Sequence, residues 1–262
     1  MNSVTSFLKS SLGKKFIMAA TGAVLFLFVV GHLLGNLQIY GPPEMINRYG
    51  HFLKSVPELL WGVRLFLLLC VTLHIISAVQ LEAANRRARP VGYANGTVYG
   101  AEWMSRYTLM SGAVIAAFVL YHLAHFTVLL PGINGVGDFR KLETTLPGGV
   151  QTHDVYAMMV LGFQVWWVSL FYLVAQAFLF IHLGHGIASM FQSLGFRNTV
   201  WTPRIKWFAK VASTLIFIGY ASIPIAIYLR IVGADYAQQK RLELKSPSVV
   251  MVGQTTGKEG AK

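Results

Sequence analysis

Five long apolar stretches, separated by polar connections, dominate the chain. They run over 16–37, 59–84, 107–130, 157–190 and 211–232. A helix rises 1.5 Å per residue, so roughly 20 apolar residues cross a hydrocarbon core about 30 Å thick. The pattern therefore predicts an all-α membrane protein with a bundle of five transmembrane helices. The fourth stretch exceeds the required length, so we expect it to tilt or to project into water at its inner end.

Composition supports one membrane domain over 1–232, followed by a polar tail over 233–262. The chain is 55% hydrophobic and 12% charged, which is too apolar for an ordinary soluble domain. The first stretch is too long for a signal peptide and has no small-residue cleavage site after it. Connection 38–58 contains Gly41-Pro42-Pro43 and Pro57, so we expect a turn-rich loop there. We expect the polar tail to be mobile.

Positive charge is concentrated on one side of the predicted bundle. Lysine and arginine precede the first helix and fill connections 85–106 and 195–210, at Lys9, Lys14, Lys15, Arg86, Arg87, Arg89, Arg106, Arg197, Arg204, Lys206 and Lys210. The positive-inside rule makes this the cytoplasmic side of a cell inner membrane, with the N-terminus inside and the C-terminus outside. The net charge of +12 is a poor indication of nucleic-acid binding, because the cations lie at membrane edges.

Histidine carries the candidate chemistry. Six of the eight histidines fall within apolar stretches, at His32, His74, His122, His125, His182 and His185. A polar ring in hydrocarbon is costly, so such residues are candidates for function. Each could instead bond the backbone of a neighbouring helix, but four of the five predicted helices carry at least one. A lone cysteine, Cys70, excludes an internal disulfide and a thiolate set for zinc or an iron–sulfur cluster.

The depths of these histidines predict two pairs. His32 and His122 lie about 24–25 Å beyond Lys15 and Arg106, towards the outer face, at 1.5 Å per residue. His74 lies about 24 Å beyond Glu58 on a helix that runs inward, and His182 also lies in the inner half. Two imidazoles on opposite sides of a porphyrin give a six-coordinate iron suited to electron transfer. We therefore expect two haems b between four helices.

Two histidines require a choice. Ser111-Gly112 precedes His122 at the spacing with which Thr21-Gly22 precedes His32, which favours His122 over His125 as a ligand. His185 lies one turn closer to the cytoplasm than His182, where it would meet a haem propionate or water. His125 would likewise lie beside a propionate or next to a ligand ring. Arg64 lies inside the outer membrane edge, and its simplest role is to pair with a propionate. Zinc and di-iron bundles need carboxylate arrangements that these helices lack.

Taken together, these residues resemble those of the cytochrome b subunit of succinate dehydrogenase and fumarate reductase, in its single-chain, five-helix, two-haem form. The resemblance covers about 16–232 and rests on the joint order of short motifs: Gly31-His32-Leu33, His51-Phe52-Leu53, His74, Ser111-Gly112, Tyr121-His122, His182 with Gly186, and Thr202-Pro203-Arg204. It implies that His32 and His122 bind the outer haem iron, and that His74 and His182, rather than His185, bind the inner one.

The resemblance also implies partners and a reaction. In succinate:quinone oxidoreductase, which is respiratory complex II of the tricarboxylic acid cycle, a flavoprotein with covalent FAD and an iron–sulfur subunit carry out the succinate chemistry. This chain would be their membrane anchor and would exchange electrons with quinone, usually menaquinone in this form. We expect basic segments 85–106 and 195–210 to dock the iron–sulfur subunit. We expect a quinone site at the outer end, with His51, Glu58 and Trp61.

Two other functions fit the same pattern. A haem b anchor of a hydrogenase or a formate dehydrogenase would carry similar histidines and bind different soluble partners. A haem-free, proton-coupled transporter would use the histidines to carry protons. Co-purifying subunits distinguish the first alternative, and a visible spectrum distinguishes the second.

Overall fold

The computed structural model describes residues 6–7, 10–88 and 107–245, and most of them lie in helices. Five helical segments are long and apolar enough to cross a membrane: Ser11–Tyr40, Pro57–Ala88, Thr108–Val128, Trp166–Ser193 and Trp201–Tyr228. The prediction of five such helices is confirmed, and the chain has the architecture of a multi-pass membrane protein.

The helices follow one another with short irregular segments at their ends. Along the chain they are α2 (Ser11–Asn36), η1 (Leu37–Tyr40), α3 (Pro43–Ser55), α4 (Pro57–Ala88), α6 (Thr108–Leu123), the π turn η2 (Ala124–Val128), η3 (Phe139–Lys141), α7 (Val155–Phe163), α8 (Trp166–Ser193), α9 (Trp201–Tyr228) and α10 (Ala234–Lys245). Strands β1 (Glu143–Leu146) and β2 (Val150–His153) form an antiparallel hairpin before α7.

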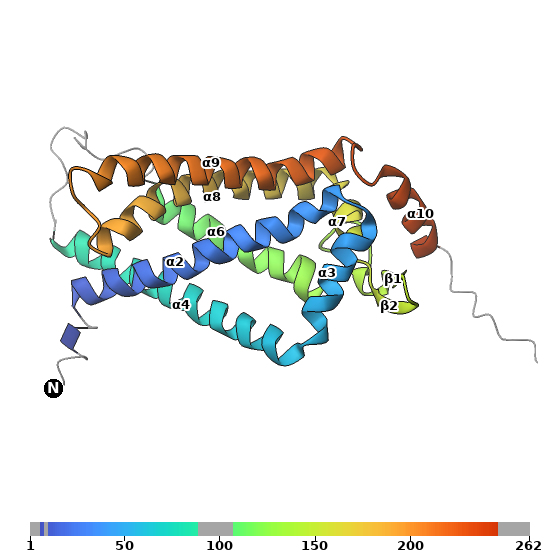
Figure 1. Cartoon of the computed structure of the whole chain (residues 1–262), viewed down its shortest axis with the longest axis horizontal. Coiled ribbons are helices and arrows are strands. Elements are labelled where there is room, and N and C mark those ends of the chain that lie inside the picture. Colours follow the sequence, from blue (N-terminus) through green and yellow to red (C-terminus); the bar gives the residue numbers. More distant parts are fainter. Residues whose placement is uncertain (1–5, 8–9, 89–106, 246–262) are drawn as a thin grey trace, which may run out of the picture.

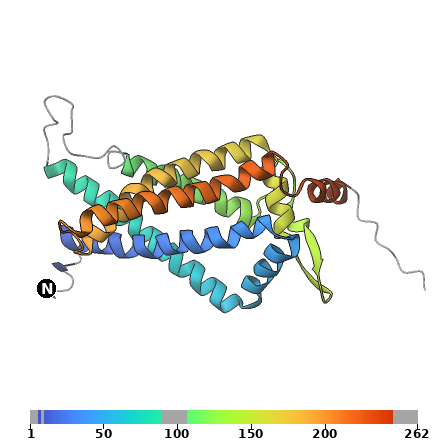
Figure 2. The same ribbon diagram turned by 45° about the horizontal axis from the view of Figure 1, so that its top comes forward.

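The two helices α2 and α8 hold the bundle together. α2 packs against α4 and α8, and α8 also packs against α6 and α9. The long helices run between two ends (Figures 1 and 2). We call the end where α2 begins and α8 connects to α9 the N-terminal end. We call the opposite end, which carries α3, the hairpin, α7 and α10, the capped end.

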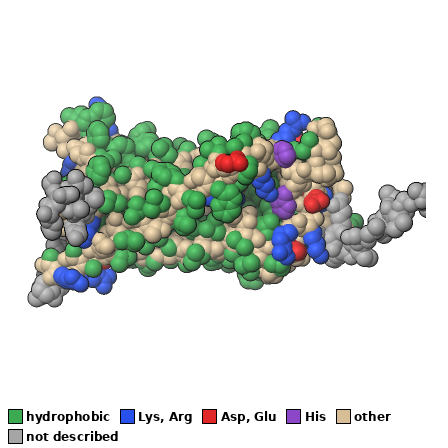
Figure 3. All heavy atoms as spheres, turned by 90° about the horizontal axis from the view of Figure 1, so that it is seen from below, with side chains coloured by type: hydrophobic (Ala, Val, Ile, Leu, Met, Phe, Trp, Pro, Cys, Tyr) green, Lys and Arg blue, Asp and Glu red, His purple; other side chains and the backbone are tan. Residues whose placement is uncertain are grey.

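Apolar side chains cover the flanks of the bundle. Leu27, Leu65 and Leu215 are 68%, 60% and 62% exposed, respectively, and each lies within a long helix. A space-filling view shows hydrophobic side chains along the flank, with lysine and arginine gathered near both ends (Figure 3). Such a surface is unfavourable in water and favourable against lipid.

A compact cap closes one end of the bundle. Ile39, Phe139, Val160 and Leu161 are 0–1% exposed in its core, which packs beneath α3, the hairpin and α10. α7 is buried within this cap from Tyr156 to Phe163. The cap therefore fixes the parts of α6 and α8 that lie at this end of the bundle and pack against it.

Asp154 is the polar centre of the cap. Its carboxylate is fully buried and accepts hydrogen bonds from the Ala157 amide at 2.9 Å, the Asn47 side chain at 3.1 Å and the Tyr236 hydroxyl at 2.7 Å. The Lys240 ammonium lies 3.5 Å away. A buried charge is stable only when it is paired and hydrogen-bonded, as here. These contacts cap α7 and attach α3 and α10 to it.

The prediction of one helix over 157–190 is wrong. α7 ends at Phe163 and α8 begins at Trp166, with Val165 in an extended conformation between them. The Ser169 hydroxyl donates to the Phe163 carbonyl at 2.5 Å, which satisfies an acceptor left free by the break. Both sides of the break are apolar, so hydropathy does not reveal it. Residues 155–163 of the long apolar stretch therefore belong to the cap, and α8 itself is 28 residues long.

The connections are also more helical than the sequence indicated. The expected loop over 38–58 contains α3, which has Pro43 at its start and Glu44 in its first turn, both typical of helix starts. The last membrane helix begins at Trp201, ahead of the expected 211, because it continues through a charged amphipathic turn. Residues 234–245 of the expected mobile tail form α10, with Ala237 buried against α7. Segments 89–106 and 246–262 lie outside the described residues.

Candidate functional site

Four histidines from four helices meet in two pairs inside the bundle. His32 on α2 faces His122 on α6, with ring centroids 5.7 Å apart and ring planes at 84°. His74 on α4 faces His182 on α8, with centroids 6.2 Å apart and planes at 65°. These are the pairs expected from the sequence. Their role as iron ligands stays a prediction.

The spacing within each pair fits a shared metal ion. A histidine nitrogen lies about 2 Å from a bound first-row metal, so two rings on opposite sides of one ion have centres about 6 Å apart. Among the described residues, no three His, Cys, Asp or Glu side chains lie close enough to hold an ion alone. A metal held by one such pair would need further ligands from another source, such as the porphyrin nitrogens that surround haem iron.

Hydrogen bonds orient the His74 ring. Its Nδ1 lies 3.1 Å from the Met18 carbonyl oxygen and 3.3 Å from the Thr21 hydroxyl. The carbonyl can only accept, so Nδ1 carries the proton and Nε2 keeps its lone pair for a metal. A Cβ on Gly22 would lie 3.3 Å from the ring, so even alanine at this position would press against it.

His182 has a matching environment on the other side of the bundle. Its Nδ1 lies 3.3 Å from the Ser111 hydroxyl, and its ring also bonds the Thr108 backbone. A Cβ on Gly112 would lie 3.4 Å from the ring. The hydroxyl–glycine motifs of α2 and α6 therefore contact the inner pair, while the histidine further along each of these helices belongs to the outer pair. The repeated spacing noted in the sequence reflects this internal symmetry.

The outer pair has a more aromatic environment. Phe28 stacks on His32 with centroids 5.3 Å apart and planes at 16°. His122 packs against Phe118 and Phe126, and its Nδ1 lies 3.2 Å from the Tyr172 hydroxyl. The sequence pattern does not single out Tyr172. The only signal was a hydroxyl inside an apolar stretch, and its contact with α6 depends on helix packing.

The two remaining membrane histidines occupy different positions. His125 is 1% exposed in the cap core, where its Nδ1 lies 3.1 Å from the same Tyr172 hydroxyl. It therefore contacts a neighbour of the outer pair rather than the opposite helix α2. His185 lies one turn beyond His182 on α8 and is partly buried. A role for either beside a propionate stays a prediction.

The expected quinone residues lie at the capped end. His51 is on α3, while Glu58, Trp61 and Arg64 follow the turn into α4. The Arg64 guanidinium lies over the Trp61 ring at 5.1 Å, and Glu58 is exposed. Desolvation and the nearby charge of Arg64 lower the pKa of Lys54, which is an exposed side chain near the end of α3. Such a pair of cations favours an anionic group between its members.

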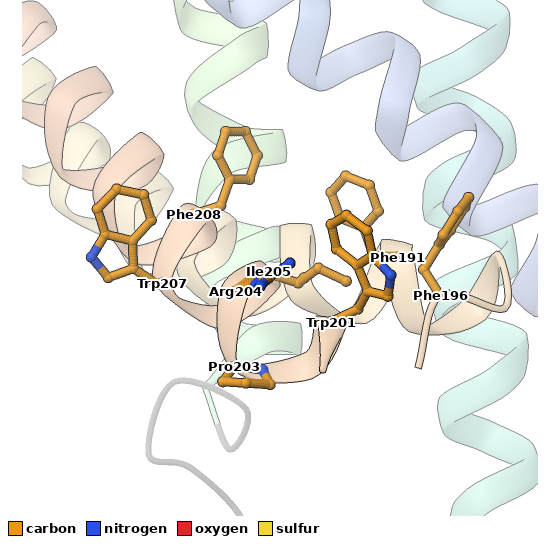
Figure 4. A pocket seen from close by; sticks show the side chains of 8 residues that line it. All are labelled: Phe191, Phe196, Trp201, Pro203, Arg204, Ile205, Trp207 and Phe208. Carbon is orange, nitrogen blue, oxygen red and sulfur yellow. The ribbon is translucent and has the colours of Figure 1, made fainter. Parts of the chain in front are cut away.

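A groove opens at the N-terminal end, between the end of α8 and the start of α9. It has a volume of about 870 Å³ and is lined by aromatic and aliphatic side chains with one cation: Phe191, Phe196, Trp201, Pro203, Arg204, Ile205, Trp207 and Phe208. Figure 4 shows these side chains, with Arg204 in their midst. The Arg204 guanidinium lies 5.5 Å from the centre of the Trp201 ring. The groove thus combines apolar walls with a positive charge.

No known protein family, curated protein or solved structure matches this chain. The paired histidines and the bundle that holds them are therefore the features that indicate a function.

Proposed function

We propose that this chain is the membrane-anchor cytochrome b subunit of a succinate:quinone oxidoreductase. The observation that carries the proposal is the meeting of four intramembrane histidines in two pairs across four helices. Isolated polar rings would not need partners at two separate depths. When bound, two haems b would supply one-electron carriers between a partner subunit and membrane quinone.

The residues of the chain have distinct parts in this proposal. His32 and His122 hold the outer haem, and His74 and His182 hold the inner one. Backbone and hydroxyl acceptors at the inner pair hold Nδ1 of each ring, which would leave Nε2 available to a haem iron. Lys54 and Arg64 would balance a propionate at the outer end. The apolar helices exclude water from both pairs.

Charge at the N-terminal end supports a docking surface for the iron–sulfur subunit. The described cations there are Lys14, Lys15, Arg86, Arg87, Arg197, Arg204, Lys206 and Lys210, and the described carboxylate among them is Glu82, bound to Arg86 at 2.7 Å. An excess of lysine and arginine also favours a cytoplasmic location for this end. We place the flavoprotein and the iron–sulfur subunit there, with the Arg204 groove at the contact.

The test is purification of the complex from its native membrane. The proposal expects a flavoprotein with covalent FAD and an iron–sulfur protein to co-purify with this chain. The double variant Arg87→Glu with Arg204→Glu should release both soluble subunits, because charge reversal replaces attraction with repulsion. Haem absorbance and membrane insertion should stay unchanged.

The matched control reverses the same number of charges at the capped end, with Arg140→Glu and Lys141→Glu. This variant should keep its soluble subunits. Normal assembly of the Arg87/Arg204 variant would refute the docking surface. Co-purification with hydrogenase or formate dehydrogenase subunits instead would refute the succinate assignment.

A further inference from the structure

The Tyr172 hydroxyl links two histidines. It lies 3.2 Å from Nδ1 of His122 and 3.1 Å from Nδ1 of His125. Tyr172 is on α8 and is 4% exposed, whereas both histidines belong to the segment of α6 and its π turn. π turns inside helices frequently mark functional positions. The arrangement gives the outer pair a tyrosine that bridges His122 to a second histidine.

The donors and acceptors of these three side chains determine which atom donates in each hydrogen bond, from His122 through Tyr172 to His125. A neutral His122 that binds iron through Nε2 carries its proton on Nδ1, which must then donate to the tyrosine oxygen. The tyrosine has one proton of its own, and Nδ1 of His125 is the acceptor within reach. His125 therefore keeps its proton on Nε2. Iron binding at one end thus fixes the tautomer at the other.

The second ring nitrogen of His125, at the end of this series of hydrogen bonds, is surrounded by apolar groups. Nε2 of His125 is buried and has no hydrogen-bond partner among the described residues. Phe126 stacks on the ring at 4.0 Å and Phe139 at 5.6 Å, while a Cβ on Gly162 would lie 3.2 Å from Nε2. A buried polar atom without a partner lowers stability, so packing alone does not favour a histidine here.

We propose that Tyr172 and His125 are positioning residues that set the orientation and basicity of His122, and with them the redox potential of the outer haem. This inference rests on the proposed haem-binding function. Partners of the second ring nitrogen fix a ligand's tautomer and raise its basicity. His125 polarises the tyrosine hydroxyl, which then accepts more strongly from Nδ1 of His122. At the inner pair, the Thr21 and Ser111 hydroxyls donate only to backbone carbonyls.

The test is a redox titration of the purified full-length protein, in which haem absorbance reports the reduced fraction of each haem. Tyr172→Phe removes the acceptor from Nδ1 of His122, so the ligand donates less electron density to iron. The outer component should shift to higher potential while the inner component stays in place. His125→Phe should shift it in the same direction by a smaller amount. The electron paramagnetic resonance signal of the low-spin outer haem should change position in both variants.

The matched control is Tyr121→Phe, which removes a hydroxyl from the same aromatic cluster. That hydroxyl donates to the Ile133 carbonyl at 2.9 Å and does not touch His122 through a ring nitrogen. An equal shift in this control, equal shifts of both haems, or no shift in either test variant would overturn the inference. If Tyr172→Phe loses the outer haem, His125→Phe decides by the same criteria. Absence of haem from the unsubstituted protein would refute the proposed function instead.

Discussion

Replacing His74 or His182 with alanine should remove the inner haem and leave the outer haem bound, and replacing His32 or His122 should do the reverse. Each variant should retain about half of the haem, because a single imidazole cannot hold a six-coordinate, low-spin iron between two helices. The pairs come from different helices, so each loss should affect one spectral component. The measurements are haem content and reduced-minus-oxidised spectra of the purified variants.

His185→Gln is the matched control for this series. It changes a histidine one turn from His182 on α8 and should keep both haems. Loss of the inner haem in this variant, with retention in His182→Ala, would assign the ligand to His185. Ligand variants that lose both haems equally, while the bundle remains folded, would contradict two separate sites.

Quinone-linked activity should depend on the carboxylate and the histidine at the turn between α3 and α4. Reduction or oxidation of a quinone requires protons as well as electrons, and Glu58 and His51 are the groups that we propose to transfer them. At least one of Glu58→Gln and His51→Ala should lower quinone turnover by about 100-fold or more. Transfer of electrons from succinate to an artificial dye should survive, because it does not use this end.

Glu44→Gln controls for loss of a carboxylate at the same end. Glu44 is exposed in the first turn of α3 and should be replaceable without loss of quinone turnover. Haem content should stay unchanged in all three variants. Full activity in both test variants, with an inhibitor bound beside His74 and His182, would place quinone at the opposite end and refute this site.

The histidine pairs were accessible from the sequence because helix geometry converts residue counts into depth. An apolar stretch fixes where a helix enters the membrane, so positions such as His32 and His74 acquire a height within it. Two histidine rings at the same height on neighbouring helices are then expected to form a pair. In the structure, the four rings form these same two pairs.

The details around the rings were not accessible, because they depend on which helices are neighbours. The spacing of Thr21-Gly22 and His32 was visible, but its contact with His74 requires α2 to lie against α4. Tyr172 reaches His122 only because α8 packs on α6. The break before Trp166 was hidden for a different reason, since protein contacts in the cap replace lipid around an equally apolar segment.

The most direct measurement is the haem content of the intact chain, purified under mild conditions and fully loaded. The account predicts two haems b per chain, with two low-spin signals of the type given by paired imidazoles. A single haem, or a protein without visible absorbance that is folded and correctly inserted, would contradict it.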